Sequence, residues 1–289
     1  MNVFVAGGTG FVGRSLCAVL ADRGHAVTAA SRSPDPSGLP PGVDTAAVDV
    51  TDPDHLSDAV AGHDAVVNLV ALPSHVQPRG RSHDAVHRGG TRNLVRACGE
   101  RGVDRFVQIS GLGVDGGAHT AYFAAKRRAE RLVRRSDLEW VVYRPSVVFG
   151  DGCAILPFVR SVVPPGVAFL PGGGDAMRLQ PLWVGDLAPM LADGVTDARH
   201  VGRVYRLGGP EVLTLAELAR LVRRVRLVVP VPLPAAAVAF GAAELLPWVP
   251  FGLDQYRVLR LDNTVADNDV GAFGVDEAAM LRLREYLRR

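Results

Sequence analysis

Short apolar runs alternate with helix-like segments over the first half of the chain. The runs have the length of buried strands, and the segments between them repeat apolar residues every three to four positions, as helices that pack on a sheet do. This alternation predicts an α/β fold in which a doubly wound parallel sheet carries helices on both faces. We expect strands near residues 2–6, 26–30, 44–48, 64–70, 104–109 and 139–143, and helices near 11–23, 53–61, 82–101 and 120–136.

The pattern changes after the sixth expected strand. Glycine and proline gather at 164–174, and a helix pattern runs into a strand pattern near 226–227 with no turn residue, which could alter the local lobe. We therefore expect one domain over 1–150, to which some later segments return, and a smaller C-terminal lobe over 151–289 that binds a substrate or a partner. Within this lobe the expected strands are 181–184 and 203–207, and the expected helices are 186–193, 214–225, 233–246, 252–260 and 275–288.

Three glycines spaced three residues apart, Gly7, Gly10 and Gly13, follow the first expected strand and open the first expected helix. A strand, a glycine turn and a helix N-terminus together form a cradle for the pyrophosphate of a dinucleotide. Gly7 would allow the tight turn, Gly10 the approach of the phosphates, and Gly13 the close packing of the helix on the strand. The first domain is therefore predicted to be a Rossmann-type nucleotide-binding domain.

The end of the second expected strand indicates which nucleotide binds. NAD(H) sites usually carry a carboxylate there, which holds the ribose 2′-hydroxyl. Here the strand ends in Ser31 and Arg32, and no acidic residue occurs before Asp35. Because a guanidinium suits a 2′-phosphate, and Arg14 could join it, NADP(H) is favoured over NAD(H). Asp49, after the third strand, could accept a hydrogen bond from the adenine amino group or cap the next helix.

A serine, a tyrosine and a lysine form the candidate reactive group. Ser110 closes the fifth expected strand, and Tyr122 and Lys126 stand four residues apart on one face of the next helix. An ammonium near a phenol favours the phenolate, so we expect Lys126 to lower the pKa of Tyr122 toward the range of a working acid or base. A serine hydroxyl beside the phenol can orient and polarise a carbonyl.

Together, the glycine motif, Ser110 and Tyr122-x-x-x-Lys126 resemble the short-chain dehydrogenases/reductases. The glycine spacing is that of the extended and atypical branches, which include sugar-nucleotide epimerases and dehydratases. The segment 143–150, after the sixth expected strand, resembles the one that flanks the nicotinamide in those proteins. The atypical subgroup named for the nucleotide-binding accessory subunit of respiratory complex I is similar in three later segments, 180–188, 205–211 and 254–263. The residues expected to contact NADP(H) are Gly7, Thr9, Gly10, Phe11, Val12, Gly13, Arg14, Ser31, Arg32, Asp49, Val50, Val70, Ala71, Lys126, Arg144, Pro145, Ser146 and Val148.

The resemblance implies three functions. The first is an NADP(H)-dependent oxidoreductase of a small or apolar carbonyl or alcohol, such as a quinone-like or isoprenoid compound. In such an enzyme Tyr122 would donate or take the proton, and Ser110 would position the substrate oxygen. Lys126 would lower the pKa of Tyr122 and hold the ribose of the cofactor. The second is a non-catalytic NADP(H)-binding accessory or assembly protein of a respiratory complex. The third and weaker one, a sugar-nucleotide epimerase or dehydratase, is opposed by the short interval between Ser110 and Tyr122.

Composition narrows the partners and the compartment. The 289 residues carry 32 basic and 30 acidic side chains, for a net charge of +2, so no overall field favours a nucleic acid or an anionic membrane. Three cysteines, Cys17, Cys98 and Cys153, suit a reducing compartment and give no disulfide framework. The first strand leaves no room for a signal peptide, and the apolar stretch 228–251 contains prolines and a glutamate and makes a poor transmembrane span. A cytoplasmic protein is expected.

Several features leave two interpretations open. His83 and His87 share one helix face but lack a third ligand, so no metal is expected, and His87 stands where the family often has asparagine. The loop 72–81 could meet a substrate or only solvent. The apolar helix 235–249 is expected to pack on the nucleotide-binding domain. The alternative is a surface patch that admits a hydrophobic substrate or docks to a membrane complex, and docking would place the protein at the membrane periphery. Asp186 is expected to cap a helix.

Overall fold

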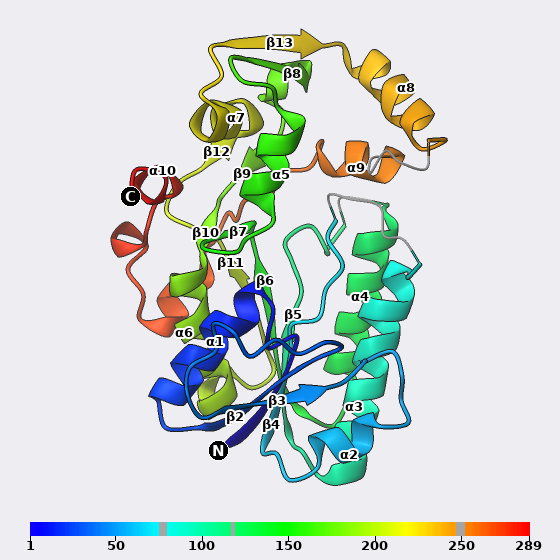
Figure 1. Cartoon of the computed structure of the whole chain (residues 1–289), viewed down its shortest axis with the longest axis vertical. Helices are drawn as coiled ribbons and strands as arrows, with labels where there is room; N and C mark the ends of the chain where they lie inside the picture. Colours follow the sequence, from blue (N-terminus) through cyan, green and yellow to red (C-terminus); the bar gives the residue numbers. More distant parts are fainter. Residues whose placement is uncertain (75–79, 117–118, 247–251) are drawn as a thin grey trace.

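A seven-stranded parallel sheet forms the centre of the larger part of the molecule (Figure 1). The structure is a computed structural model, and it describes residues 1–74, 80–116, 119–246 and 252–289. The strand order is β11-β6-β5-β4-β1-β2-β3, and every neighbouring pair is parallel. The strands are β1 (Asn2–Ala6), β2 (Ala26–Ser31), β3 (Val43–Ala47), β4 (Ala65–Asn68), β5 (Arg105–Ile109), β6 (Glu139–Pro145) and β11 (Arg203–Leu207).

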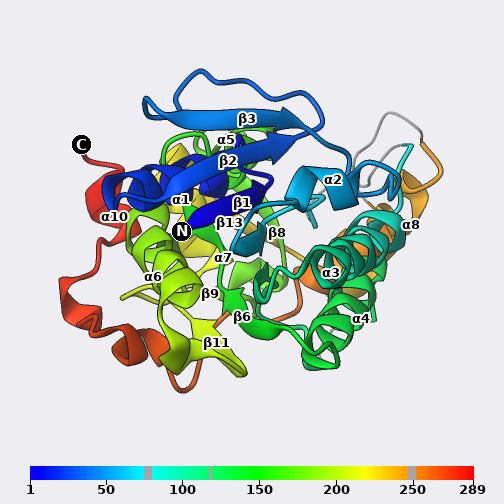
Figure 2. The same ribbon diagram turned by 90° about the horizontal axis from the view of Figure 1, so that it is seen from below.

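Helices cover both faces of this sheet (Figure 2). On one face, α1 (Phe11–Asp22) packs on α6 (Val184–Thr196). On the other face, α2 (Leu56–Val60), α3 (Gly90–Arg101) and α4 (Ala121–Arg134) lie side by side. The doubly wound α/β fold predicted from the alternating pattern is therefore confirmed. Because β11 pairs with β6 and α6 packs on α1, two segments of the second half of the chain return to the larger part.

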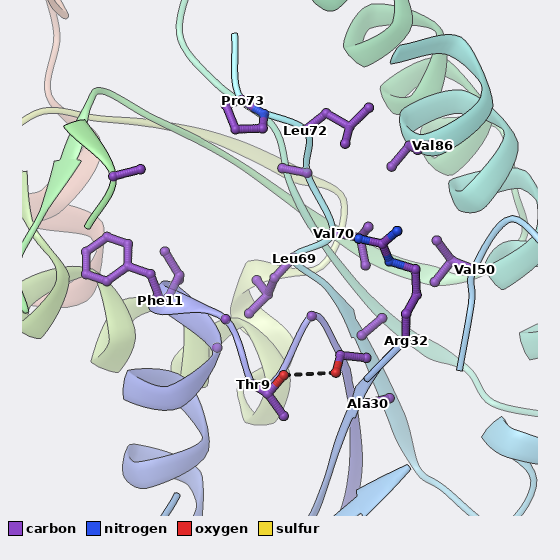
Figure 3. Close-up of a pocket in the computed structure, with 18 of the residues that line it drawn as sticks. Thr9, Phe11, Ala30, Arg32, Val50, Leu69, Val70, Leu72, Pro73 and Val86 are labelled. Atoms are coloured by element: carbon purple, nitrogen blue, oxygen red, sulfur yellow. Dashed lines mark hydrogen bonds between the residues drawn. The ribbon is translucent and has the colours of Figure 1, made fainter. Parts of the chain in front are cut away.

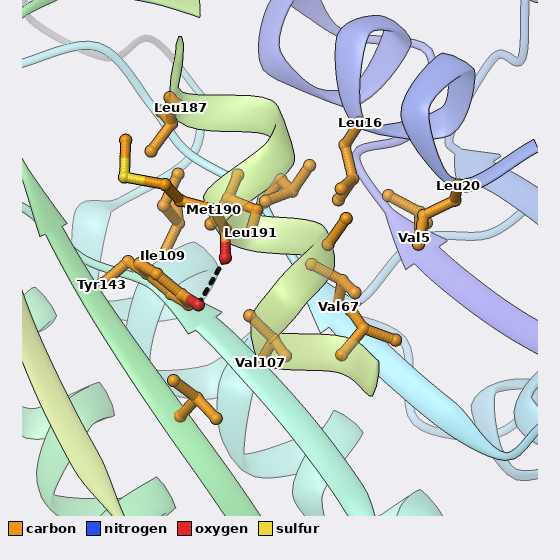
Figure 4. Packing of buried hydrophobic residues seen from close by; sticks show 14 of the residues in the cluster. Val5, Leu16, Leu20, Val67, Val107, Ile109, Tyr143, Leu187, Met190 and Leu191 are labelled. Atoms are coloured by element: carbon orange, nitrogen blue, oxygen red, sulfur yellow. Dashed lines mark hydrogen bonds between the residues drawn. The ribbon is translucent and has the colours of Figure 1, made fainter. Parts of the chain in front are cut away.

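The side chains between the sheet and its helices form two large apolar clusters. Figure 4 shows the one under α1 and α6, where Val5, Val67 and Val107 of the sheet meet leucines of both helices. The Tyr143 hydroxyl in this cluster donates a hydrogen bond to the Met190 carbonyl oxygen, at 2.7 Å. These contacts fix the strand ends, which together form the edge where ligands of such sheets bind.

The smaller lobe is built from three two-stranded sheets and short helices above that edge (Figure 1). The strand pairs are β7 (Val148–Phe149) with β10 (Leu182–Trp183), β8 (Val167–Pro171) with β13 (Leu227–Val231), and β9 (Arg178–Leu179) with β12 (Leu213–Thr214). The helices are α5 (Ile155–Val162), α7 (Leu215–Arg223), α8 (Leu233–Ala243), α9 (Leu253–Val258) and α10 (Leu283–Tyr286).

Three predictions of local structure were wrong. The expected helix 275–288 is a short 3₁₀ turn, Glu277–Ala279, followed by α10. The expected helix 82–101 opens with a π-helix, Asp84–Gly89, before α3 begins. A turn does separate α7 from β13, because Arg224 adopts a left-handed conformation with φ 51°. A non-glycine residue rarely takes this conformation, so the turn could not be recognised from the residue types.

Candidate active site

The glycine turn after β1 has no room for side chains. A Cβ atom on Gly13 would lie 2.2 Å from the Gly7 carbonyl oxygen, and Gly7 itself has a φ of +84°. The Gly7 amide donates to the Ala30 carbonyl oxygen at 2.7 Å, which ties the turn to β2. Gly10 is the N-cap of α1 and has no side-chain cap. The turn and the open helix N-terminus therefore have the form of a pyrophosphate cradle.

A cleft of about 570 Å³ opens above this turn, at the carboxyl ends of β1, β2 and β4 (Figure 3). Most residues expected to contact the cofactor line it, together with Tyr122. The lining members of that set are Gly7, Thr9, Gly10, Phe11, Val12, Gly13, Ser31, Arg32, Asp49, Val50, Val70, Ala71 and Val148.

A second cleft of about 280 Å³ continues from the first. Its lining includes Ser110, Lys126, Pro145 and Ser146, and Tyr122 and Val148 line both clefts. The α9 residue Val258 and nearby Leu261 close it from the side of the smaller lobe. The phenol thus stands where a nucleotide-sized space meets a smaller, partly apolar one.

Arg32 is an unpaired cation among the described residues that line the first cleft. It extends between Val50 and Val70 (Figure 3), it is exposed, and it has no ion-pair partner in the part of the chain that the structure describes. Beside it, the Thr9 hydroxyl donates to the Ser31 hydroxyl oxygen at 2.9 Å. Arg14 is placed differently, because its Nε donates to the Thr9 carbonyl oxygen at 2.9 Å and its guanidinium pairs with Asp35. Arg14 braces the glycine turn and does not line either cleft.

Asp49 lies in the first cleft but is already paired. Its carboxylate accepts hydrogen bonds from the Arg81 guanidinium, the shorter at 2.6 Å, and from the Thr51 amide and hydroxyl. The Arg81 hydrogen bonds hold the pKa of Asp49 well below its usual range. Asp49 does not cap α2, which begins at Leu56 without a side-chain cap. Arg81 itself was named only as part of the loop 72–81, of which residues 75–79 lie outside the described residues.

Ser110, Tyr122 and Lys126 come together at the second cleft. The Lys126 ammonium is buried, donates to the Ile109 carbonyl oxygen at 3.2 Å, and lies 5.8 Å from the centre of the Tyr122 ring. The Ser110 hydroxyl oxygen is buried and has no hydrogen-bond partner among the described residues. An unpartnered buried hydroxyl is costly unless a ligand supplies the hydrogen bond. This serine is therefore poised to meet an oxygen of a bound molecule.

The pKa values at this site differ from the expectation. Burial raises the pKa of Tyr122 to about 12. Burial also lowers the pKa of Lys126 to about 8, against the opposing effect of the Glu130 carboxylate. The cost of burying charge thus outweighs the effect of the lysine on the phenol, and the neutral phenol is a proton donor.

Two histidines surround the Tyr122 ring. His83 and His87 stack on each other with ring centres 5.5 Å apart, and each meets Tyr122 edge-on, at 5.4 and 5.3 Å. The two histidines stand four residues apart, a spacing that places side chains on one face of a helix and so brings the rings together. Burial, with the charges of Lys126 and His83, lowers the pKa of His87 to about 2, and its Nε2 accepts a hydrogen bond from the Leu72 amide. No group of three metal-binding side chains occurs in the described ranges.

The Arg144 side chain does not reach the clefts. Its guanidinium is buried, pairs with the buried Glu130 carboxylate at 2.6 Å, and also contacts Asp115 at 2.5 Å. These pairs anchor the end of β6, so that Pro145 and Ser146 can line the second cleft. Asp186 is not an N-cap, since α6 begins at Val184; its carboxylate accepts a hydrogen bond from the Leu281 amide instead.

A family model described as NAD(P)H-binding matches residues 7–152. The chain belongs to this NAD(P)H-binding family. This membership agrees with the resemblance to the short-chain dehydrogenases/reductases, which predicted a protein that binds a nicotinamide nucleotide.

Two curated relatives cover most of the chain. The mitochondrial NADH dehydrogenase [ubiquinone] 1 alpha subcomplex subunit 9 of Arabidopsis thaliana is 31% identical, over 91% of this chain and 71% of its own length. A 3 beta-hydroxysteroid dehydrogenase/Delta 5→4-isomerase of Mycobacterium tuberculosis is also 31% identical, over 76% of this chain and 68% of its own length. The relatives of this chain therefore include both a subunit of a respiratory complex and a dehydrogenase.

Among solved structures, the NAD complex of UDP-glucose 4-epimerase from Thermus thermophilus superimposes with a TM-score of 0.73. It is 21% identical, and the match covers 100% of this chain and 97% of that chain. At this identity the likeness shows the fold. Among the described residues, no helix combines the length and the apolar content that a membrane crossing needs.

Proposed function

We propose that this protein is an NADP(H)-dependent oxidoreductase that reduces an apolar carbonyl compound or oxidises the corresponding alcohol. The observation that carries the proposal is the position of Tyr122, which lines both the nucleotide-sized cleft and the smaller cleft beside it. The glycine turn supports the cofactor, because a Cβ on Gly13 would meet backbone oxygen at 2.2 Å and the turn therefore stays open for a ligand phosphate. When bound there, a nicotinamide nucleotide supplies the hydride.

Each residue of the reactive group has a role in this proposal. The Tyr122 phenol, neutral because burial raises its pKa to about 12, donates a proton to the carbonyl oxygen during reduction and takes it back from the alcohol during oxidation. The unpartnered Ser110 hydroxyl donates a hydrogen bond to the same oxygen and so orients it. Lys126, held by the Ile109 carbonyl oxygen, keeps a positive charge near the phenol and would hold the ribose of the bound nucleotide.

The second cleft favours an apolar substrate of modest size. Aliphatic side chains such as Met177, Val258 and Leu261 form much of its wall, and its volume is about 280 Å³. Burying apolar surface there would supply the binding free energy, while Ser110 and Tyr122 fix one oxygen. The relative named as a 3 beta-hydroxysteroid dehydrogenase supports this substrate class, a hydroxyl or carbonyl group on an apolar skeleton. A quinone-like or isoprenoid carbonyl compound fits the same description.

Tyr122→Phe tests the catalytic role. NADPH oxidation is followed with a panel of apolar ketones and quinones, and the variant is expected to lose about 10²- to 10⁴-fold in kcat, while the Kd for NADPH stays unchanged. Tyr286→Phe is the matched control, because it also removes one phenolic oxygen but lies outside both clefts. Equal turnover in wild type and Tyr122→Phe would contradict the proposal.

The preference for NADP(H) rests on Arg32, an exposed guanidinium without an ion-pair partner among the described residues, at the end of β2. We expect Arg32→Ala to weaken NADPH binding about 10- to 100-fold, the effect of removing a charge-assisted hydrogen bond pair, and to leave NADH binding unchanged. Fluorescence titration with both nucleotides measures this. Arg92→Ala, an exposed arginine of α3, is the control. A loss that is the same for both nucleotides would contradict the preference.

A second function is favoured by the relative named as a subunit of mitochondrial NADH dehydrogenase. In this alternative the protein binds NADP(H) without turnover and serves as an accessory or assembly protein of a respiratory complex, with the 235–249 segment as the contact; residues 247–249 lie outside the described residues. It predicts co-migration with that complex on native gels, and full function of the Tyr122→Phe variant. The weaker alternative, a sugar-nucleotide epimerase or dehydratase, predicts binding of uridine or thymidine diphosphate.

A further inference from the structure

The helix α8 turns an apolar face to solvent. Its outward residues follow the spacing of one helix face, with Ala235, Val238, Ala242 and, just beyond the helix end, Leu245. The exposed fractions of Val238 and Leu245 are 72% and 83%. A surface helix normally carries polar residues on the face away from the core. No charged residue occurs from Leu227 to Ala243, so α8 has no polar face at all.

The opposite face of α8 is already used. Ala236 is its one fully buried residue, and the Phe240 ring lies 5.8 Å from the Tyr256 ring of α9. A Cβ on Gly241 would contact the Leu253 side chain of α9 at 3.7 Å. The helix is therefore docked on α9, not on the nucleotide-binding part, and its outward face stays uncovered by the described residues.

The strand pair β8–β13 extends this apolar face. Phe169 and Val229 are register partners, as are Val167 and Leu227, so their side chains share one face of the pair. The exposed fractions of Phe169 and Leu227 are 61% and 59%. Figure 1 shows β13 leading directly into α8 along one edge of the molecule. We call this surface, made of Phe169, Leu227, Val229, Ala235, Val238, Ala242 and Leu245, the apolar edge.

Cations gather where the apolar edge begins. Arg220 and Arg224 are exposed at the end of α7, and Arg226 is exposed immediately before Leu227. None of these three arginines has an ion-pair partner in the described part of the chain, whereas most arginines of the larger part do. An uncovered apolar surface beside unpaired arginines is complementary to a layer that is apolar inside and negatively charged at its surface.

We propose that the apolar edge docks on the surface of a bilayer that contains anionic lipids. At 1.5 Å per residue, the eleven residues of α8 span roughly 16 Å, too short to cross a membrane, so the helix would lie in the plane of the interface. The apolar edge carries one exposed aromatic ring, that of Phe169, and no side-chain hydrogen-bonding group. A typical protein interface carries about one hydrogen bond per 100–200 Å², so an apolar surface without such groups, flanked by unpaired arginines, favours an anionic lipid layer over a protein partner.

Docking in this way would serve an apolar substrate. The helix α9, on which α8 lies, contributes Val258 to the wall of the second cleft. A molecule dissolved in the bilayer would therefore meet the protein next to the cleft that holds Tyr122. This last step rests on the proposed function, but the docking itself does not, because it depends on residues outside both clefts.

Vesicle co-sedimentation of the full chain tests the proposal. Vesicles of phosphatidylcholine alone are compared with vesicles that contain 30% phosphatidylglycerol, a composition chosen for the test. We expect binding to the anionic vesicles at least tenfold tighter than to the neutral ones, and loss of most binding at about 0.5 M salt, where charges are screened. Failure of the wild-type protein to bind anionic vesicles would overturn the proposal.

Two double variants separate the contributions of the apolar side chains and of the arginines to vesicle binding. Val238→Glu/Leu245→Glu and Arg224→Glu/Arg226→Glu are each expected to weaken vesicle binding at least tenfold. Arg131→Glu/Arg135→Glu, exposed arginines at the end of α4, makes the same charge change elsewhere and is expected to keep more of the binding than either. NADPH binding should be unchanged in all three, which shows that the chain is folded and separates this test from that of the proposed function.

Other occupants give different results. If the apolar edge joined two copies of this chain, sedimentation velocity would show a dimer that Val238→Glu/Leu245→Glu converts to a monomer, without any vesicle binding. If it bound a respiratory complex, the protein would co-sediment with native membranes but not with protein-free vesicles. Either result would overturn the proposal, as would equal losses in the α4 control and the apolar-edge variants.

Discussion

The helices α4 and α8 present opposite surfaces, although both lie near the second cleft. In α4 the buried side chains include Phe123, Lys126 and Val133, while arginines such as Arg131 face solvent. In α8 both faces are apolar, and only Ala236 is fully buried. The first helix is amphipathic and its orientation follows from its own sequence. The helix α8 has no such asymmetry, so its exposed apolar face is explained by contact with a partner outside the chain.

The same contrast extends to the two parts of the molecule. The part with α4 is closely packed around polar groups with definite partners, such as the buried pair of Arg144 and Glu130. The apolar edge, which includes the outward face of α8, is exposed to solvent and has unpaired arginines beside it. Substitutions should therefore be costly to folding in the first part and nearly neutral to folding in the second. The following predictions test this difference, from the largest expected effect to the smallest.

The largest effect is expected at the buried ion pair. Arg144→Met leaves the Glu130 carboxylate buried without its cation, and we expect a loss of about 3–5 kcal/mol in the free energy of unfolding, measured by urea denaturation. Arg144→Met/Glu130→Leu removes both charges and should recover much of that loss. If Arg144→Met alone were as stable as wild type, the ion pair would not anchor β6.

The glycines of the two parts should respond differently. Gly13→Ala places a Cβ 2.2 Å from backbone oxygen, so we expect a loss of about 3 kcal/mol in the free energy of unfolding and no measurable NADPH binding. Gly241→Ala is the matched change in α8, where the nearest atom is a leucine side-chain carbon at 3.7 Å. This variant should change the free energy of unfolding by less than about 1 kcal/mol, because the new Cβ meets the leucine at an ordinary van der Waals distance and alanine favours a helix. Similar losses in both variants would contradict the contrast.

The buried lysine should give a pH dependence. Burial lowers the pKa of Lys126 to about 8, against 10.5 for an ordinary lysine. Between these values the unfolded chain holds a proton that the folded chain has lost, so the free energy of unfolding rises with pH through this window. Relative to Lys126→Met, wild type should gain roughly 2 kcal/mol between pH 8 and pH 10, measured by denaturation at each pH. Parallel curves for the two proteins would contradict a neutral buried lysine.

The smallest effect is expected on the apolar edge. Val238→Gln replaces an exposed side chain, and Val238 is 72% exposed, so the free energy of unfolding should stay within about 0.5 kcal/mol of wild type. Val142→Gln in β6 is the buried counterpart and should be strongly destabilising, since Val142 is fully buried. A large loss for Val238→Gln would mean that α8 is covered by the chain itself.

The sequence predicted the sheet, the nucleotide turn and the family because each depends on short-range signals. Strand length, the glycine spacing around Gly10 and the period of α4 are all local. The π-helix before α3 was missed because it differs from an α-helix in the spacing of its backbone hydrogen bonds and not in its residue pattern. The left-handed Arg224 was missed for a similar reason.

Side-chain pairing was harder to predict than chain topology. Arg14 and Arg144 were expected at the cofactor, but Arg14 pairs with Asp35 and Arg144 with Glu130. Each ion pair joins residues 14 to 21 positions apart, and several equally plausible partners exist in the sequence. The raised pKa of Tyr122 also depends on burial, which spacing alone does not reveal. The roles of the site residues remain predictions that the variants above test.

The most direct test of the account is the ionisation of Tyr122 with and without NADP⁺. Tyrosine Cζ is labelled with ¹³C, and the Tyr122 resonance is assigned by its loss in Tyr122→Phe. Without nucleotide we predict no titration up to pH 10, because burial raises the pKa to about 12. With NADP⁺ bound, its positive ring and Lys126 should bring the pKa below the value of about 10 for free tyrosine. An identical titration in both states would contradict the role of Tyr122 as the acid and base of a nicotinamide-dependent enzyme.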